Sequence, residues 1–426
     1  SQFLVISGVE NDLSKAHVMA RYQQIMFDNA FGNFETILQK ISVSPAMGNW
    51  LDSVNNDRPD ATKGRVPNEN YAREIMQLFS IGLEELKTDG TPLTDANGEP
   101  IPTYDQDDIK QFARVFTGWT YANPDGSAIT KKNGVYYGAD MGVFPGTATT
   151  GHDTDAKTLL NGTVLPAGQT AEKDLADAVH NVFVHPNTGP FVSKLLIQRL
   201  VTGNPSSAYV GRVAAVFNNN GSGVRGDLRA VVRAILLDPE ARGPAKADPA
   251  FGSLREPVLM LTGLVRALNG VTDGAALGDR ASVLGQRPYY SPTVFNYFQP
   301  DTTIPGTSIL APEFGIHDSN SAVARTNLVY SLVYSGIAPD GTLADATGTR
   351  LNTYQFDPYA TDAATLTDKV SEMLLGGVLP ADARTAVINA VNAITLSATP
   401  TAQQLTDRSR MAVYLIASSY HYQVQR

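Results

Sequence analysis

The chain of 426 residues contains no cysteine. Without cysteine it can form no disulfide bond, has no thiolate nucleophile, and cannot build a zinc site from thiolates. The absence suits an exported bacterial protein, which then carries no thiol that could pair wrongly in an oxidising compartment. Many cytosolic proteins would lose nothing by the same absence, so it removes kinds of chemistry without deciding the compartment.

Long apolar runs and long basic runs are missing too. No stretch approaches about 18 uninterrupted apolar residues, so we expect no membrane-spanning segment. The formal net charge is -9 at pH 7 and no basic run exceeds Lys131-Lys132, which argues against binding to nucleic acid. A signal peptide is not visible, but residues 1–7 resemble the end of an apolar helix. We therefore expect that the natural N-terminal segment is lacking.

Familiar catalytic motifs are also missing. The chain has no nucleophile elbow, no phosphate-binding loop and no His-Glu-x-x-His pair for zinc. The segment from Gly221 to Gly226 has the glycine spacing of a dinucleotide-binding loop, but the residues before it repeat like a helix and not like a strand. We therefore reject a dinucleotide cofactor.

Apolar residues recur with helical spacing through most of the chain. After Pro67, for example, Tyr71, Ile75 and Leu78 form one buried stripe, and Asp105 stands where the cap of a following helix is expected. These patterns predict a mainly α fold, an irregular multi-helix bundle.

Three segments interrupt the helical pattern. Asn97-Gly98 predicts a small β-hairpin insertion, in which both residues adopt positive φ. Residues 121–169 and 288–312 show no sustained period and predict two long irregular loops. The expected organisation is an N-terminal helical part, 1–120, an irregular region, 121–169, and a C-terminal helical part, 170–426, together forming one compact unit.

The densest group of polar residues lies at the head of the helix that follows Pro67. Glu69 and Arg73 are four residues apart, as are Asn70 and Glu74, so each pair shares a helix face. In a catalytic interpretation, Glu69 or Glu74 is a general acid or base and Arg73 holds an anionic group. In a structural interpretation, which we favour, Glu69 stabilises the helix N-terminus electrostatically, and Arg73 and Glu74 form buried ion pairs that join helices.

A second polar group lies in the irregular region. His152 and Asp153 predict either a divalent metal site, completed by one of the glutamates and with His185 as a further ligand, or a hydrogen bond from His152 that fixes the loop. We favour the hydrogen bond. Asp107 and Asp108 lie at an expected helix start, where carboxylates stabilise the free N–H groups; calcium binding is the less favoured alternative.

Several of these segments together resemble the bacterial family of domain of unknown function 1800, over nearly the whole chain. The residues that carry the resemblance are Asn68-Glu69-Asn70-Tyr71-Ala72-Arg73-Glu74, Leu78-Phe79, Gly82, Asp108-Ile109, Ala113-Arg114, Thr117-Gly118-Trp119, Gly151-His152-Asp153, Lys157, His185-Pro186-Asn187, Phe191-Val192, Lys194-Leu195 and Ser291-Pro292 through Pro300.

The resemblance implies a helical protein that is exported to the periplasm, the cell surface or the extracellular space. It also implies an additional N-terminal helical segment and a possible partner, because members are often encoded beside a second uncharacterised family that resembles sulfatases. No activity is attached to the family that could be transferred to this chain.

Two hypotheses for the function follow. The first is an uncharacterised exported scaffold or binding protein that acts with a partner. The alternative is an enzyme, a hydrolase or oxidoreductase acting on an extracellular substrate, with a pocket between the polar helix and the loop of His152. The expected catalytic residues are Glu69, Arg73, Glu74 and His152, with His152 and Asp153 as the metal ligands; the further pocket residues are Asn70, Tyr71, Asp108, Arg114 and Trp119.

Overall fold

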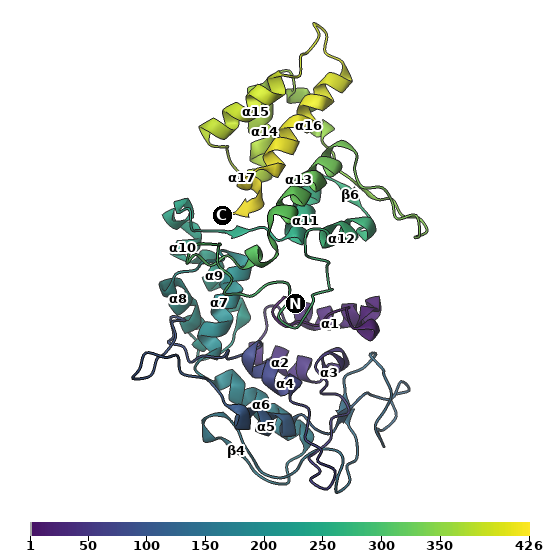
Figure 1. Ribbon diagram of the computed structural model, residues 1–426, viewed down its shortest axis with the longest axis vertical. Helices are drawn as coiled ribbons and strands as arrows, with labels where there is room; N and C mark the ends of the chain where they lie inside the picture. The colour runs from purple at the N-terminus through teal and green to yellow at the C-terminus, as the bar shows by residue number, and fades with distance from the viewer. Residues whose placement is uncertain (1) are drawn as a thin grey trace. The chain divides into compact units, whose positions relative to one another are not determined.

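The computed structural model describes residues 2–426 and confirms the predicted mainly α fold. In the described part of the chain, the strands form only two-stranded antiparallel sheets, which join loops and do not build a layer (Figure 1). No helix between residues 2 and 426 is long and apolar enough to cross a membrane.

The chain divides into two compact units. Unit 1 comprises residues 2–201, 205–249 and 291–296, and unit 2 comprises residues 202–204, 250–290 and 297–426. Each unit has its own cluster of buried apolar side chains, so each has a core that can stabilise it. The irregular region predicted at 121–169 lies within unit 1.

Unit 1 contains the candidate site. Its elements are η1 (Asn11–Ser14), α1 (Ala16–Asp28), α2 (Phe34–Ser42), α3 (Pro45–Trp50), α4 (Asn70–Gln77), α5 (Gln106–Val115), β1 (Trp119–Thr120), β2 (Gly142–Val143), β3 (Lys157–Thr158), η2 (Leu160–Gly162), β4 (Val164–Leu165), α6 (Ala171–Val184), α7 (Thr188–Leu200), α8 (Ser207–Asn218), α9 (Leu228–Leu237), α10 (Pro239–Arg242) and η3 (Pro244–Ala247). Helix α5 packs against α4, α6 and β3, which places it at the centre of the site.

Local sequence explains where several of these helices begin. Asn33, Asp105 and Asp227 each accept a backbone N–H bond from the first turn of α2, α5 and α9. At α5 the bond is reciprocal, because the Asp108 carboxylate accepts the N–H of Asp105 in a capping box. The expected cap at Asp105 is confirmed.

The predicted hairpin is present as a loop with isolated bridges, which pair Thr94 with Pro100 and Leu86 with Pro92. Its turn differs from the expectation, because only Gly98 has positive φ. The Asp95 carboxylate accepts the N–H groups of Asn97 and Glu99, so a side chain closes the turn in place of a second left-handed residue.

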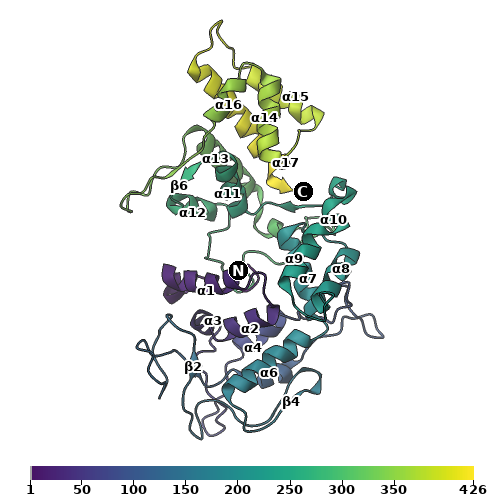
Figure 2. The same cartoon turned by 180° about the vertical axis from the view of Figure 1, so that it is seen from behind.

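Unit 2 is a helical assembly in which α16 packs against α13, α14 and α15 (Figure 2). Its elements are β5 (Ser253–Leu254), α11 (Pro257–Ala267), β6 (Val271–Thr272), α12 (Ala275–Ser282), η4 (Pro312–Ile316), α13 (Ser319–Tyr334), β7 (Thr349–Arg350), η5 (Tyr354–Tyr359), α14 (Ala363–Leu375), α15 (Ala381–Asn392), α16 (Ala402–Ser418), α17 (Tyr420–Gln423) and β8 (Val424–Gln425). Strand β5 pairs with β8 and β6 with β7.

The capping box of α5 can be tested by mutation. Replacing Asp105 by Ala removes the acceptor for two backbone N–H groups, and we expect the free energy of unfolding to fall by about 1 kcal/mol. Urea denaturation measures this change. The matched control is Asp107→Ala, which removes only a solvent-exposed pair with Lys110 and should change stability by less than about 0.5 kcal/mol. Equal losses in the two variants would contradict the capping role.

Candidate functional site

The polar face of α4 carries one ion pair of its own and one hydrogen bond to the next helix. Glu69 is at the N-cap position of α4. Its carboxylate accepts hydrogen bonds from Nη2 of Arg73 at 3.2 Å and from Nε2 of Gln106, the first residue of α5, at 2.9 Å. Glu69 and Arg73 are both partly exposed. The carboxylate thus joins α4 to α5 through the neutral amide of Gln106, whereas the ion pair with Arg73 lies along α4 itself. This differs from the structural interpretation, which expected buried ion pairs of Arg73 and Glu74 between helices.

Glu74 is the exception on this helix. It is only 9% exposed, and its Oε2 has no hydrogen-bond partner among the described residues. Burial raises the pKa of Glu74 to about 7, although the charge of Arg73 acts in the opposite direction. Burial also raises the pKa of the nearby Tyr104 to about 12, and Glu74 adds to that shift. Glu74 is therefore a buried carboxyl group whose burial the charge of Arg73 offsets only in part.

The other expected pocket residues of this region have structural contacts. The Asn70 side chain donates to Asp52 at 2.7 Å, and Asp108 belongs to the capping box of α5. Tyr71 is buried with its hydroxyl 2.6 Å from Ser42, and burial raises its pKa. Trp119 is buried in β1, and its indole N–H has no partner within residues 2–426.

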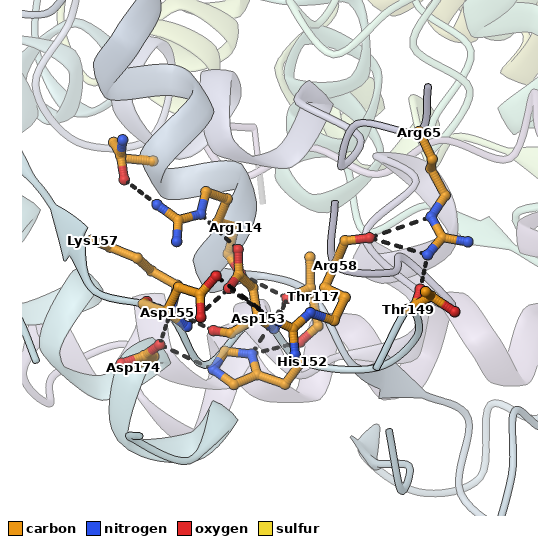
Figure 3. Close-up of polar contacts among 11 residues, drawn as sticks. Arg58, Arg65, Arg114, Thr117, Thr149, His152, Asp153, Asp155, Lys157 and Asp174 are labelled. Atoms are coloured by element: carbon orange, nitrogen blue, oxygen red, sulfur yellow. Dashed lines mark hydrogen bonds and ion pairs between the residues drawn. The ribbon is translucent and has the colours of Figure 1, made fainter. Parts of the chain in front are cut away.

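His152 lies in a closed polar network (Figure 3). Its Nε2 is 3.0 Å from Oδ2 of Asp174, in the first turn of α6, and its Nδ1 is 3.1 Å from the carbonyl oxygen of Thr117, just after α5. Both ring nitrogens thus face acceptor oxygens of the protein. The favoured expectation, a hydrogen bond from His152 that fixes the loop, agrees with this geometry.

Lys157 also binds the carboxylate of Asp174. Its side chain is 1% exposed, and Nζ donates to Oδ2 of Asp174 at 2.7 Å, to the carbonyl of Asp155 at 3.0 Å and to the carbonyl of Asp153. All three protons of the ammonium group therefore have an acceptor. Burial acts to raise the pKa of Asp174, but hydrogen bonds from His152, Lys157 and Gln169 outweigh it, and the pKa lies below its usual value.

Asp153 forms the other half of the network. Its Oδ2 accepts Nε of Arg114, on α5, at 2.6 Å, and Nη2 of Arg58 lies 3.9 Å from Oδ1. Its backbone N–H donates to the Thr117 hydroxyl at 2.8 Å. Burial opposes ionisation of Asp153, but the bond from Arg114 and the backbone bond from Asp155 prevail and lower the pKa. We call the group of Arg114, Thr117, His152, Asp153, Lys157 and Asp174 the His152 network.

Gly118 allows this network to form. It has a φ of +87°, and a Cβ at this position would lie 2.6 Å from the backbone nitrogen of His152. Such a contact is far shorter than atoms tolerate, and the left-handed conformation also favours glycine. The loop of His152 can therefore lie directly against the turn after α5 only because residue 118 has no side chain.

The described residues contain no group of three or more side chains that could hold a metal ion. Both ring nitrogens of His152 and the carboxylate of Asp153 already have protein partners. His185, considered as a third ligand, lies just past the far end of α6 from Asp174, about 16 Å along the helix axis. Burial and the charge of Arg225 lower its pKa to about 4. The metal site suggested by the sequence therefore has no ligand set here.

The structure divides the expected pocket residues between two polar groups. Arg114, His152 and Asp153 come together in the His152 network, whereas Glu69, Arg73 and Glu74 belong to α4. Glu69 bonds to Gln106, and Asp153 bonds to Arg114, about 12 Å further along α5. Among the described residues, no hydrogen bond or ion pair joins the polar residues of α4 to the His152 network.

Sequence reasoning missed the residue at the centre of the network. Asp174 lies in the first turn of α6, where an acidic residue is expected for purely local reasons, so nothing marks it as a partner of His152. Thr117 and Lys157 contributed to the family resemblance, but their spacing carried no recognisable chemistry. Only the packing of α5, β3 and α6 brings these residues together.

The fold and the site together define a mainly helical protein with a buried network of balanced charges and no recognisable catalytic constellation among residues 2–426. A family model described as "Protein of unknown function (DUF1800)" matches residues 1–424, and the chain belongs to this family. No curated protein and no solved structure matches the chain.

The network makes a prediction about stability. Asp174→Asn removes the negative charge that pairs with Lys157 and that also bonds to His152, and we expect the free energy of unfolding to fall by about 3 kcal/mol at pH 7. Because the folded pKa of Asp174 is lowered, its contribution is present above the unfolded pKa of about 3.9 and is lost as the pH falls further. Urea denaturation at pH 7 and pH 3 measures both effects.

The matched control is Asp177→Asn, on the same helix. Asp177 also accepts a bond from Gln169 and pairs with Lys173, but it is partly exposed. We expect its loss to cost less than about 1 kcal/mol. A cost at Asp174 no larger than at Asp177 would show that the network does not hold the fold.

Proposed function

We propose that the protein is an exported scaffold or binding protein without catalytic activity that acts with a partner protein. The observation that carries the proposal is the closed bonding of His152. A catalytic histidine needs one ring nitrogen that can exchange a proton with a substrate. Both nitrogens of His152 face acceptors inside the protein.

The neighbouring charged groups support the same proposal. Lys157 has three protein acceptors, and Asp153 is paired with Arg114, so neither is free to bind a substrate. Closed networks of this kind hold segments rigidly, which is what a binding surface requires. Export and the kind of partner, a protein that resembles sulfatases, are what the family resemblance implies, and the absence of cysteine is compatible with export.

A surface suited to such a partner lies at the end of α1. Phe27, in its last turn, is 79% exposed, and Phe31, in the following turn, is 59% exposed. The guanidinium group of Arg229 lies 5.9 Å from the ring centre of Phe31. Aromatic residues and arginine are enriched in the energetically important parts of protein interfaces. We therefore place partner binding at Phe27 and Phe31.

Binding of a sulfatase-like protein, of the kind often encoded beside members of the family, tests the proposal. Calorimetry with the two purified proteins should show binding, and Phe27→Ser/Phe31→Ser should weaken it at least about tenfold, because two aromatic contacts are lost. Val164→Ser, which changes an exposed apolar residue on β4, is the control and should bind normally. Absence of binding by the unaltered protein, or equal binding by the double variant, would contradict the proposal.

The enzyme alternative retains one specific observation, the buried carboxyl of Glu74. A buried carboxyl with a pKa of about 7 is suited to proton transfer at neutral pH. In this alternative Glu74 is the general acid or base of a hydrolase or oxidoreductase. Arg73, whose charge lowers the pKa of Glu74, and Tyr104, whose pKa Glu74 raises, would then hold the substrate.

Glu74→Gln separates a chemical role from a structural one. The folded pKa of about 7 exceeds the unfolded value of 4.5, so ionisation of Glu74 opposes folding increasingly as the pH rises from 4.5 to 7. The variant should therefore be more stable than the unaltered protein by about 1–2 kcal/mol at pH 8 and equally stable at pH 4. Thermal unfolding at the two pH values measures the difference.

The control for this variant is Glu69→Gln, on the same helix but partly exposed and paired, which should not show the gain at pH 8. Hydrolysis of chromogenic esters and glycosides provides the activity readout. Activity that is lost in Glu74→Gln together with the gain in stability would favour the enzyme. A loss of stability at every pH would instead give Glu74 a structural role.

A further inference from the structure

Three tyrosines form a compact group on the surface of unit 2. Tyr330 and Tyr334 are one turn apart on α13, and their rings stack with centres 4.6 Å apart and planes 27° apart. Tyr414, on α16, meets both rings edge-on, at 5.7 Å from Tyr330 and 6.1 Å from Tyr334. We call these residues the tyrosine platform.

Two rings of the platform pack on the core of unit 2, and the third is exposed to solvent. Tyr334 and Tyr414 pack against the buried apolar cluster of unit 2, whereas Tyr330 is 51% exposed. The exposed ring is therefore held in place by two rings that the core fixes. A ligand that stacks on it would lose little affinity to the ordering of side chains.

Polar groups surround the rings. Asp407 and Arg410 lie on the same face of α16 as Tyr414, at spacings of seven and four residues, and both influence Tyr334 electrostatically. Nε of Arg410 is buried without a hydrogen-bond partner among the described residues. The hydroxyl groups of the three tyrosines likewise have no hydrogen bond with any described residue. The platform thus combines ring faces with several unused donors and acceptors.

This combination matches the chemistry of a saccharide. One face of a pyranose ring presents C–H groups, which pack on the electron-rich face of an aromatic ring, while its edges present hydroxyl groups. A carboxylate and a guanidinium group can each engage neighbouring hydroxyls through charge-assisted hydrogen bonds. A cationic ligand fits less well, because Arg410 is beside the rings, and a nucleic acid is disfavoured by the net charge of -9.

We propose that Tyr330, Tyr334 and Tyr414, with Asp407 and Arg410, form a binding site for a neutral oligosaccharide. Tyr330 supplies the stacking face, and Tyr334 and Tyr414 orient its ring. Asp407 and Arg410 form hydrogen bonds with hydroxyl groups at the edge of the sugar. This site lies in unit 2, and it is independent of the partner surface at Phe27 and Phe31 in unit 1.

Binding can be tested with the full chain and defined probes. Calorimetry and saturation-transfer NMR with cellohexaose, chitohexaose, maltohexaose and xylohexaose should show binding of at least one of them. Tyr330→Ala should weaken that binding about tenfold, which corresponds to the loss of one stacking contact of about 1.4 kcal/mol. Tyr330→Trp, which keeps an aromatic face, should retain it, and Asp407→Asn should weaken it.

Tyr420→Ala is the matched control. Tyr420 is another exposed tyrosine of unit 2 that lies against a ring, His421, but it belongs to a different helix, α17. Its loss should leave binding unchanged. The proposal is overturned if none of the four oligosaccharides binds, if Tyr330→Ala binds as well as the unaltered protein, or if a proline-rich peptide binds the platform in their place.

Discussion

The buried ion pair of Lys157 with Asp174 is the interaction on which the organisation of unit 1 depends. Two isolated charges could not be removed from water at this depth, but here the ammonium group has three acceptors and the carboxylate has three donors. The pair joins β3, which lies within the long irregular region, to α6, which begins the next run of helices. His152 and Asp153 then connect this junction to the end of α5.

The architecture was predictable because its causes are local. The spacing of Tyr71, Ile75 and Leu78 on α4 and the capping carboxylate of Asp105 on α5 are readable from neighbouring residues alone. The site was predictable only in part. His152 and Arg114 stood out, but Asp174 did not, because its partners come from segments that only the tertiary packing brings together. The sequence also led to the prediction that the polar residues of α4 and His152 share one pocket. In the structure Glu69 and Asp153 bond to separate parts of α5, so spacing in the sequence does not by itself establish such a pocket.

The two polar groups of unit 1 illustrate opposite solutions to the same physical problem. In the His152 network each buried charge faces an opposite charge, and the pKa values of Asp153 and Asp174 are lowered in consequence. The charge of Arg73 offsets the burial of Glu74 only in part, and the pKa of Glu74 is raised. The fold balances the charges of the His152 network but not the carboxyl of Glu74. The burial of Glu74 therefore lowers the stability of the folded protein, and packing by itself does not explain why this residue is there.

The direct contact of Gly118 with His152 also bears on how the family can diversify. Thr117 and His152 are 35 residues apart in sequence, yet both ends of the intervening chain are held at one point. The free energy of closing such a loop grows only slowly with its length. Insertions or deletions in the exposed parts of this loop, such as residues 124–128, can therefore accumulate without disturbing the helices, whereas Tyr137, Met141 and Phe144 are buried and hold the rest of the loop in place. Relatives of this protein should differ in length mainly in these exposed parts, while any change at position 118 would have to be accompanied by a rearrangement at position 152.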